Sequence, residues 1–282
     1  MSPLIIGIII AIVLIIIFVV VLRMNSGPSL PSDFPVSYLV SEGKIMSKDE
    51  LKAARTNKFD LPFVPNTVSA WVKIDPSYDY KQNTRVGAII GNNDGLINNK
   101  NPFNFELHAR TRPRYYKSSN YDGTQITMDA IFEPKVPVVP NDIWSNITIV
   151  RDIINKKVIL FLDGIQTTVY DYSKDPNESK WFDNTIRLTD YIIGNDLRAG
   201  DGIPFNGSLS TVRVFNSILT PEQITKLYEV DKYNLKKIAP TTDIFSEPAS
   251  QPAAKPASQP AAQYIRYNNL YRIMTSRLNL QP

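Results

Sequence analysis

The residues best suited to chemistry lie in one short alternating stretch, positions 103–110. Every second side chain there is polar, which puts Asn104, Glu106, His108 and Arg110 on one face of an expected strand. A carboxylate beside an imidazole could act as an acid and base pair. Such a strand face is more commonly solvated or turned toward a ligand, and we expect that role here.

The sequence turns strongly basic directly after this stretch. We expect residues 110–117, which read RTRPRYYK, to form the most positive loop of the domain. Arginine guanidinium groups next to tyrosine rings suit sulfated or phosphorylated glycans, or an acidic protein patch. An ordinary charged surface loop is the alternative. The candidate ligand-binding residues are Asn104, Glu106, His108, Arg110, Arg112, Arg114, Tyr115 and Tyr116.

Several kinds of site are excluded by side chains that the sequence lacks. There is no cysteine, which excludes disulfides, thiolate zinc sites and a cysteine nucleophile. A Ser-His-Asp triad or a multi-histidine metal site would have to use His108, because it is the only histidine. The net charge of +4, without a long Lys/Arg run outside the loop at 110–117, does not indicate nucleic acid as a partner. We therefore assign no catalytic residue.

The N-terminal segment at positions 1–24 is expected to be a single-pass membrane anchor. The run Leu4–Leu22 contains nineteen residues without a charge, and a helix of that length spans about 28 Å, close to the hydrocarbon thickness of a bilayer. A cleaved signal peptide is the alternative, but its apolar core is shorter, roughly 7–15 residues. Basic residues follow the run, beginning with Arg23, and this favours a cytoplasmic position for the rest of the chain.

A polar segment at residues 25–35, rich in proline and serine, is expected to be a stalk. The folded domain is expected at residues 36–236, a length that suits one sandwich with a sizeable core. Near its start, Ser47 and Glu50 have the spacing of a capping box, which predicts a short helix to about Arg55.

Strands are expected through most of this domain, because short alternating or apolar runs recur between clusters of Asn, Asp, Gly and Pro. The expected strands are 68–74, 87–91, 103–110, 124–132, 144–152, 158–162, 165–170, 186–194 and 208–215. This spacing is typical of antiparallel sheets and not of alternating strands and helices. The predicted fold class is all-β, an antiparallel sandwich.

Two local signals fix a turn and a second helix. Asp163-Gly164 lies between two expected strands and predicts a two-residue hairpin. Thr220, Pro221 and Gln223 have the types and spacing of an N-cap, a first helical residue and a capping-box partner. The expected inner face of this helix is Ile224, Leu227, Tyr228 and Asp231.

The C-terminal part is expected to be a linker at 237–263 followed by a basic amphipathic segment at 264–282. A four-residue repeat with proline at each start begins at Pro248 and favours an extended spacer of about 50 Å. The apolar stripe of the last segment is Tyr267, Leu270, Tyr271, Met274 and Leu278. Such a peptide docks on a protein or an anionic surface, with a disordered tail as the alternative.

Several stretches, taken in order, resemble the concanavalin A-like, laminin-G-like jelly-roll family. They include Thr67–Val72, Asn141–Asp152, Val158–Gly164 and Ile193–Asp196, followed by the motif from Pro204 through the helix start. The resemblance extends from Thr67 to Tyr228. It implies a jelly-roll sandwich whose concave face binds sugars in some members.

The resemblance also bears on metal binding and catalysis. Some family members bind calcium through acidic loops, which makes Asp94, Asp196 and Asp201 the candidate ligands here, although Ser210 stands where the family often has Asp. Glycosidases of the superfamily need two carboxylates on one strand face. Neither E-x-D-x-x-E nor E-x-D-x-E occurs in the sequence. We expect no enzyme activity.

Two functions remain open. The first is a membrane-anchored binding module that recognises a carbohydrate or glycoprotein. The second is a structural role, in which the sandwich links a membrane to a protein shell through its C-terminal tether. The N-terminal anchor and Pro/Ala repeats resemble those of membrane and minor capsid proteins of large DNA viruses, and this implies a virion location and a capsid-like partner.

Overall fold

A computed structural model describes most of the predicted domain. It covers residues 12, 13, 15, 27–39, 44–53, 58–79, 85–92, 103–108, 112–121, 124–131, 139–176, 190–195 and 203–239. The predicted linker at 237–263 lies outside these residues from position 240 onward, as does the whole amphipathic segment at 264–282, whereas positions 237–239 form the end of the C-terminal helix and its cap.

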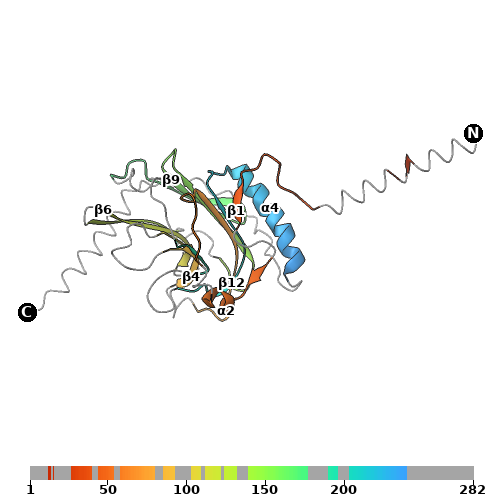
Figure 1. The fold of residues 1–282 in the computed structure, drawn as a ribbon, viewed down its shortest axis with the longest axis horizontal. Helices are drawn as coiled ribbons and strands as arrows, with labels where there is room; N and C mark the ends of the chain where they lie inside the picture. The colour runs from red at the N-terminus through yellow and green to blue at the C-terminus, as the bar shows by residue number, and fades with distance from the viewer. Residues whose placement is uncertain are drawn as a thin grey trace, which may run out of the picture.

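Two antiparallel sheets make up most of the part of the chain that the structure describes (Figure 1). The seven-stranded sheet has the order β1 (Ser37–Leu39), β12 (Gly207–Phe215), β3 (Thr67–Ile74), β8 (Ser145–Asp152), β9 (Lys157–Leu162) and β10 (Ile165–Asp171), with β2 (Ile45–Met46) also paired to β12. The five-stranded sheet has the order β11 (Ile192–Ile193), β4 (Arg85–Gly91), β5 (Phe103–His108), β6 (Arg112–Tyr121) and β7 (Thr124–Ile131). The predicted all-β fold class is confirmed.

The core between the sheets follows from the period of two along each strand. On β3, Val68, Ala70 and Val72 are buried in one cluster with Phe105 and Leu107 of β5. The neighbouring strands β8, β9 and β12 add alternate apolar residues to the same cluster. The alternation that predicted these strands therefore also identifies their inward face.

The outer face of the seven-stranded sheet is covered by α4 (Pro221–Ile238) (Figure 1). The predicted capping box is confirmed, because the Thr220 side chain accepts a hydrogen bond from the Gln223 N–H and the Gln223 side chain accepts one from the Thr220 N–H. Tyr228 stacks on Trp71 of β3 with ring centroids 5.4 Å apart. The outer face of the seven-stranded sheet and α4 therefore form a second apolar layer, smaller than the core between the two sheets.

A buried ion pair joins this helix to the sheet. Arg213 of β12 donates from Nε and Nη2 to both carboxylate oxygens of Asp231 at 2.7–3.2 Å. The Asp231 side chain is fully buried and that of Arg213 is 7% exposed. Asp231 lies on the predicted inner face of the helix, and its charge is balanced there by one specific arginine.

The N-terminal segment expected to be a stalk packs on the sandwich. Leu30 and Phe34 contact the cluster between the sheet and α4, and the Phe34 ring meets the Phe215 ring edge-on at 6.2 Å. Gly27 lies against Tyr233 of α4, so closely that an added Cβ would be 1.8 Å from the Tyr233 ring. Apolar residues of the segment predicted to be a stalk thus reach the cluster between the sheet and α4, and its role as a stalk stays a prediction.

The described residues contain no helix that is long and apolar enough to cross a membrane. Of the run Leu4–Leu22, only Ile12, Val13 and Ile15 are among them. The membrane anchor stays a prediction.

The helix expected after Ser47 is α2 (Lys48–Ala53). Its capping box is confirmed, because Glu50 accepts a hydrogen bond from the Ser47 N–H at 2.8 Å. Asp163 and Gly164 both have positive φ, 50° and 77°, as a two-residue hairpin between β9 and β10 requires.

Asp163 makes the stability of this hairpin depend on pH. Burial raises its pKa to about 6, although the Asn146 N–H donates to Oδ1 and the Lys232 charge is near. The folded state then binds a proton more tightly than the unfolded state between about pH 4 and 6, so stability falls as the pH rises through this range, by about 3 kcal/mol at most.

We expect Asp163→Asn to remove this dependence and to stabilise the protein at pH 7, because an amide keeps the Oδ1 acceptor and carries no charge to desolvate. Urea unfolding at pH 4.5 and pH 7 measures it. Equal pH dependence in the wild type and the variant would contradict the assignment.

Candidate functional site

The structure places the predicted ligand residues on two adjacent strands of the five-stranded sheet. The backbone register pairs Asn104 with Tyr116, Glu106 with Arg114, and His108 with Arg112. Directly paired residues share one face of a sheet, so these six positions belong to one face. Tyr115 pairs instead with Phe105, which is part of the core, and so its position is on the other face. Arg110 lies outside the described residues.

The centre of this face is closed. Glu106 is fully buried, and so is Ala88, its partner on β4. Phe105 and Leu107 on either side of Glu106 are buried in the core, as the alternation predicts. Glu106 thus lies on the expected face, but it is not open to a ligand in this structure.

The basic loop expected at residues 110–117 is mostly strand. β6 begins at Arg112 and pairs with β5 through Lys117. The prediction was wrong because Pro113 indicated a loop, since proline cannot donate a ladder hydrogen bond. Pro113 is buried opposite Leu107, and the pairing of β6 with β7 begins one residue later, at Arg114.

The calcium prediction rests on residues beyond the described part of the chain, because Asp94, Asp196 and Asp201 all lie there. The described residues contain no group of three or more possible metal ligands. Ser210 is fully buried and its hydroxyl donates to the Lys44 carbonyl at 3.1 Å. Ser210, at the position where the family often has a carboxylate, therefore uses its side chain for a hydrogen bond within the protein.

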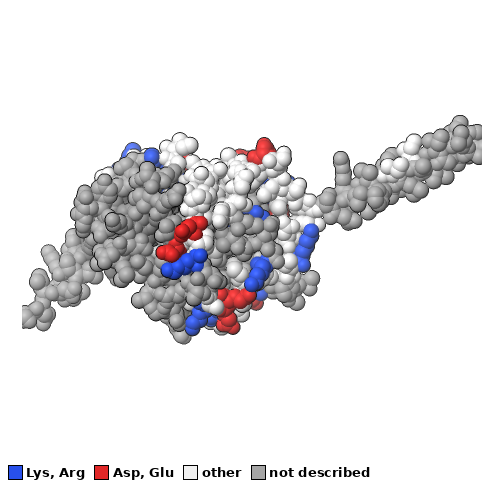
Figure 2. Space-filling model, viewed as in Figure 1, with Lys and Arg blue, Asp and Glu red and all other residues white. Residues whose placement is uncertain are grey.

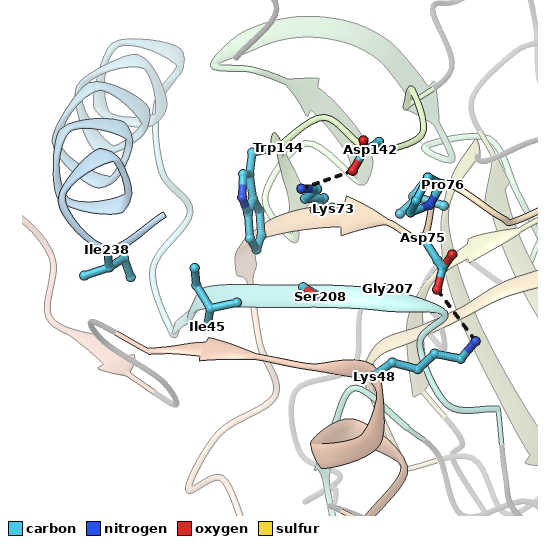
Figure 3. Close-up of a pocket in the computed structure, with 11 residues that line it drawn as sticks. Ile45, Lys48, Lys73, Asp75, Pro76, Asp142, Trp144, Gly207, Ser208 and Ile238 are labelled. Atoms are coloured by element: carbon cyan, nitrogen blue, oxygen red, sulfur yellow. Dashed lines mark ion pairs between the residues drawn. The ribbon is translucent and has the colours of Figure 1, made fainter. Parts of the chain in front are cut away.

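A surface depression of about 540 Å³ lies on the seven-stranded sheet near the C-terminal end of α4 (Figure 3), and none of the predicted residues lines it. Trp144, directly before β8, lies between an apolar side and a charged side of the depression. Ile45 of β2 and Ile238 of α4 lie on one side of it, and the pair formed by Lys73 and Asp142 lies on the other (Figure 3). The volume is within the range of small-molecule sites, about 300–1,000 Å³.

Charged groups of both signs line this depression. Lys73 Nζ lies 3.1 Å from Asp142 Oδ1, and Lys48 Nζ lies 3.9 Å from Asp75 Oδ2. Hydrogen bonds from the Ser77 hydroxyl and N–H lower the pKa of Asp75, with a smaller effect of the Lys48 charge, so this carboxylate stays ionised. The depression therefore offers ammonium donors and carboxylate acceptors beside an apolar wall.

Sequence reasoning missed this depression because five separate segments contribute to it. Its residues come from positions 45–48, 73–76, 142–144 and 207–208, with Ile238 added by α4. One signal was available, since Asn141-Asp142 precedes Trp144 at a strand start. Asp142 has a φ of 59°, and this backbone bend sets its carboxylate beside Lys73.

A family model described as "Concanavalin A-like lectin/glucanases superfamily" matches residues 48–225. The chain belongs to this superfamily. The match extends from α2 into α4 and includes all strands of the two sheets except β1 and β2. The resemblance seen in the sequence is confirmed.

Solved structures with a similar fold include carbohydrate-binding modules. A Ruminococcus gnavus sialidase module bound to α2,3-sialyllactose is 18% identical, with 68% of this chain and 96% of that chain covered and a TM-score of 0.41. A domain of a Geobacillus stearothermophilus arabinanase, in complex with arabinotriose, is 14% identical, with 68% and 72% covered and a TM-score of 0.39. No curated protein matches this concanavalin A-like chain.

Proposed function

We propose that this protein is a membrane-anchored, non-catalytic module that binds carbohydrate. The observation that carries the proposal is its membership of a superfamily of lectins and glucanases. Binding without hydrolysis is supported by the sequence, which lacks the paired carboxylates on one strand that a glycosidase of this kind needs. The anchor is the apolar run Leu4–Leu22.

The depression beside Trp144 is the site that the described geometry favours for this ligand. Sugar hydroxyls donate and accept hydrogen bonds, and Lys73 and Asp142 supply one partner of each kind. The apolar wall of Ile45 and Ile238 suits the C–H face of a sugar ring. The β5–β6 face predicted from the sequence is the alternative site, and its closed centre at Glu106 counts against it.

A glycan array with the full chain in detergent tests the function, and point variants test the site. For a glycan that binds, we expect Asp142→Ala or Lys73→Ala to weaken binding about 10- to 100-fold, because each removes a hydrogen bond to a charged group, worth about 1.5–3 kcal/mol. Titration calorimetry measures the change.

Lys58→Ala and Asp190→Ala are the matched controls. They break an exposed ion pair of 3.5 Å that does not line the depression, and they should leave binding unchanged. An array without a single bound glycan would contradict the function. Binding that survives both Asp142→Ala and Lys73→Ala would contradict only the site.

The side of the membrane on which the sandwich lies is a second test. A lumenal or external domain would favour glycan recognition, whereas the basic residues after the anchor favour the cytoplasm. Protease protection of sealed vesicles separates the two. A cytoplasmic sandwich would count against glycan binding and favour the structural role between a membrane and a protein shell.

A further inference from the structure

The N-terminal segment attaches to the sandwich at a defined place. Gly27 lies against Tyr233, in the C-terminal half of α4. From there the chain passes along α4 to β1, with Leu30 and Phe34 packed on the sheet (Figure 1). The point from which the chain leads back toward the predicted anchor is therefore fixed by packing.

The length of chain between this point and the anchor is short. Leu22, the end of the apolar run, is five residues before Gly27, and five residues span at most about 18 Å when fully extended. A folded domain of about 200 residues is roughly 40 Å across. If the run spans a bilayer, the C-terminal half of α4 cannot be far from the membrane surface.

The same half of α4 is basic on its outside. Lys236 and Lys237 are exposed, and Lys232 is half-buried. The one acidic residue between positions 230 and 238 is Asp231, and its charge is paired with Arg213. Lys237 Nζ also lies 4.2 Å from the centre of the Tyr233 ring. Figure 2 shows Lys or Arg side chains on the surface over the lower half of α4.

We propose that the C-terminal half of α4 is the membrane-facing surface of the sandwich, and that Lys236 and Lys237 bind anionic lipid headgroups. The proposal rests on the membrane anchor of the proposed function. A tether fixed at Tyr233 holds the lysines at headgroup depth, and each lysine near an anionic surface favours the bound orientation about fivefold.

The absence of cysteine gives a direct test with single labels. The full chain is placed in vesicles that carry a headgroup quencher, with a fluorophore on Ile238→Cys or on Ile154→Cys. Ile154 is 77% exposed and lies beyond the far end of β8, and the eight residues of that strand span about 26 Å.

We expect strong quenching at position 238 and little at position 154. The difference should be larger in phosphatidylcholine vesicles that contain phosphatidylserine as about a third of the lipid than in phosphatidylcholine alone. It should shrink at high ionic strength, because salt screens the attraction between lysines and headgroups.

The double variant Lys236→Gln/Lys237→Gln distinguishes the effect of lipid binding on the orientation from the effect of the tether. We expect the double variant to shift the orientation equilibrium about 25-fold away from anionic lipid, whereas Lys58→Gln/Lys174→Gln, a control on exposed lysines outside α4, should have no effect. Lys236 and Lys237 also interact favourably with the partial negative charge at the C-terminal end of α4, and their replacement therefore affects stability as well. For this reason, thermal unfolding of both double variants is measured in neutral lipid.

The outcomes are distinct. Equal quenching at both positions, or quenching that does not depend on anionic lipid, would overturn the proposal for an anchored chain. A chain that alkaline carbonate strips from vesicles would contradict the anchor itself and this proposal with it. Glycan binding on an array is unaffected by either result.

Discussion

Asp231→Ala should lower the free energy of unfolding by about 3–5 kcal/mol, because it removes the buried carboxylate that pairs with the buried Arg213 guanidinium. Arg213 has a further hydrogen bond, from Nη1 to the Ser37 hydroxyl at 3.4 Å, but that group is neutral. The loss should also loosen α4, since this ion pair joins the helix to β12. Urea unfolding of the full chain in detergent, followed by tryptophan fluorescence, measures it.

Two further variants make this expectation specific. Glu229→Ala removes an exposed carboxylate from the same helix and should change stability by no more than about 0.5 kcal/mol. Arg213→Met/Asp231→Leu removes both charges and should be more stable than Asp231→Ala alone. A double variant as unstable as the sum of its single changes would show that the two side chains are not coupled.

Gly87→Ala should destabilise the protein by about 3 kcal/mol or more, because backbone strain and overpacking each cost about 1–3 kcal/mol. Gly87 has a φ of 136°, and an added Cβ would lie 2.4 Å from the Pro204 carbonyl oxygen and 2.5 Å from the Phe205 Cα. The segment around Pro204 cannot move away freely, because Ala88 N–H donates to the Ile203 carbonyl and Asn206 N–H donates to the Val86 carbonyl.

Gly164→Ala is the comparison for this change. Gly164 also has positive φ, 77°, but an added Cβ would meet only the Tyr228 side chain, at 3.1 Å. The expected cost is about 1 kcal/mol, that of a left-handed residue with a side chain. Thermal and urea unfolding of both variants measure the difference. Equal losses would show that backbone contact at Gly87 is not what requires glycine.

Most of the sandwich could be predicted because each strand carries its own signal. β3 and β12 begin and end within one residue of the expected positions, since alternate side chains enter the core. β6 was missed because Pro113 and its arginines indicate a loop when taken alone. β1 and β2 contain three and two residues, too few for any period to show.

The candidate site was harder to predict than the fold. Lys73 and Asp142 are far apart in the chain and meet only because β3 and the turn before β8 end at the same edge. Sequence reasoning selected Glu106 for its alternation, which the structure confirms, but alternation gives the face of a strand and not what covers that face. Burial of Glu106 depends on parts of the chain that its own strand does not specify.

The position of β12 constrains when this protein can fold. β12 lies between β1 and β3 in the sheet, so positions 207–215 must enter between strands at positions 37–39 and 67–74, which are synthesised long before them. During translation, the edge of β3 that pairs with β12 therefore stays unpaired until positions 207–215 have been made. The outer apolar face of β3 stays uncovered until α4 has left the ribosome as far as Ile238. Pairing over such sequence distances is slow, and the nascent chain has to be kept from aggregating during that interval.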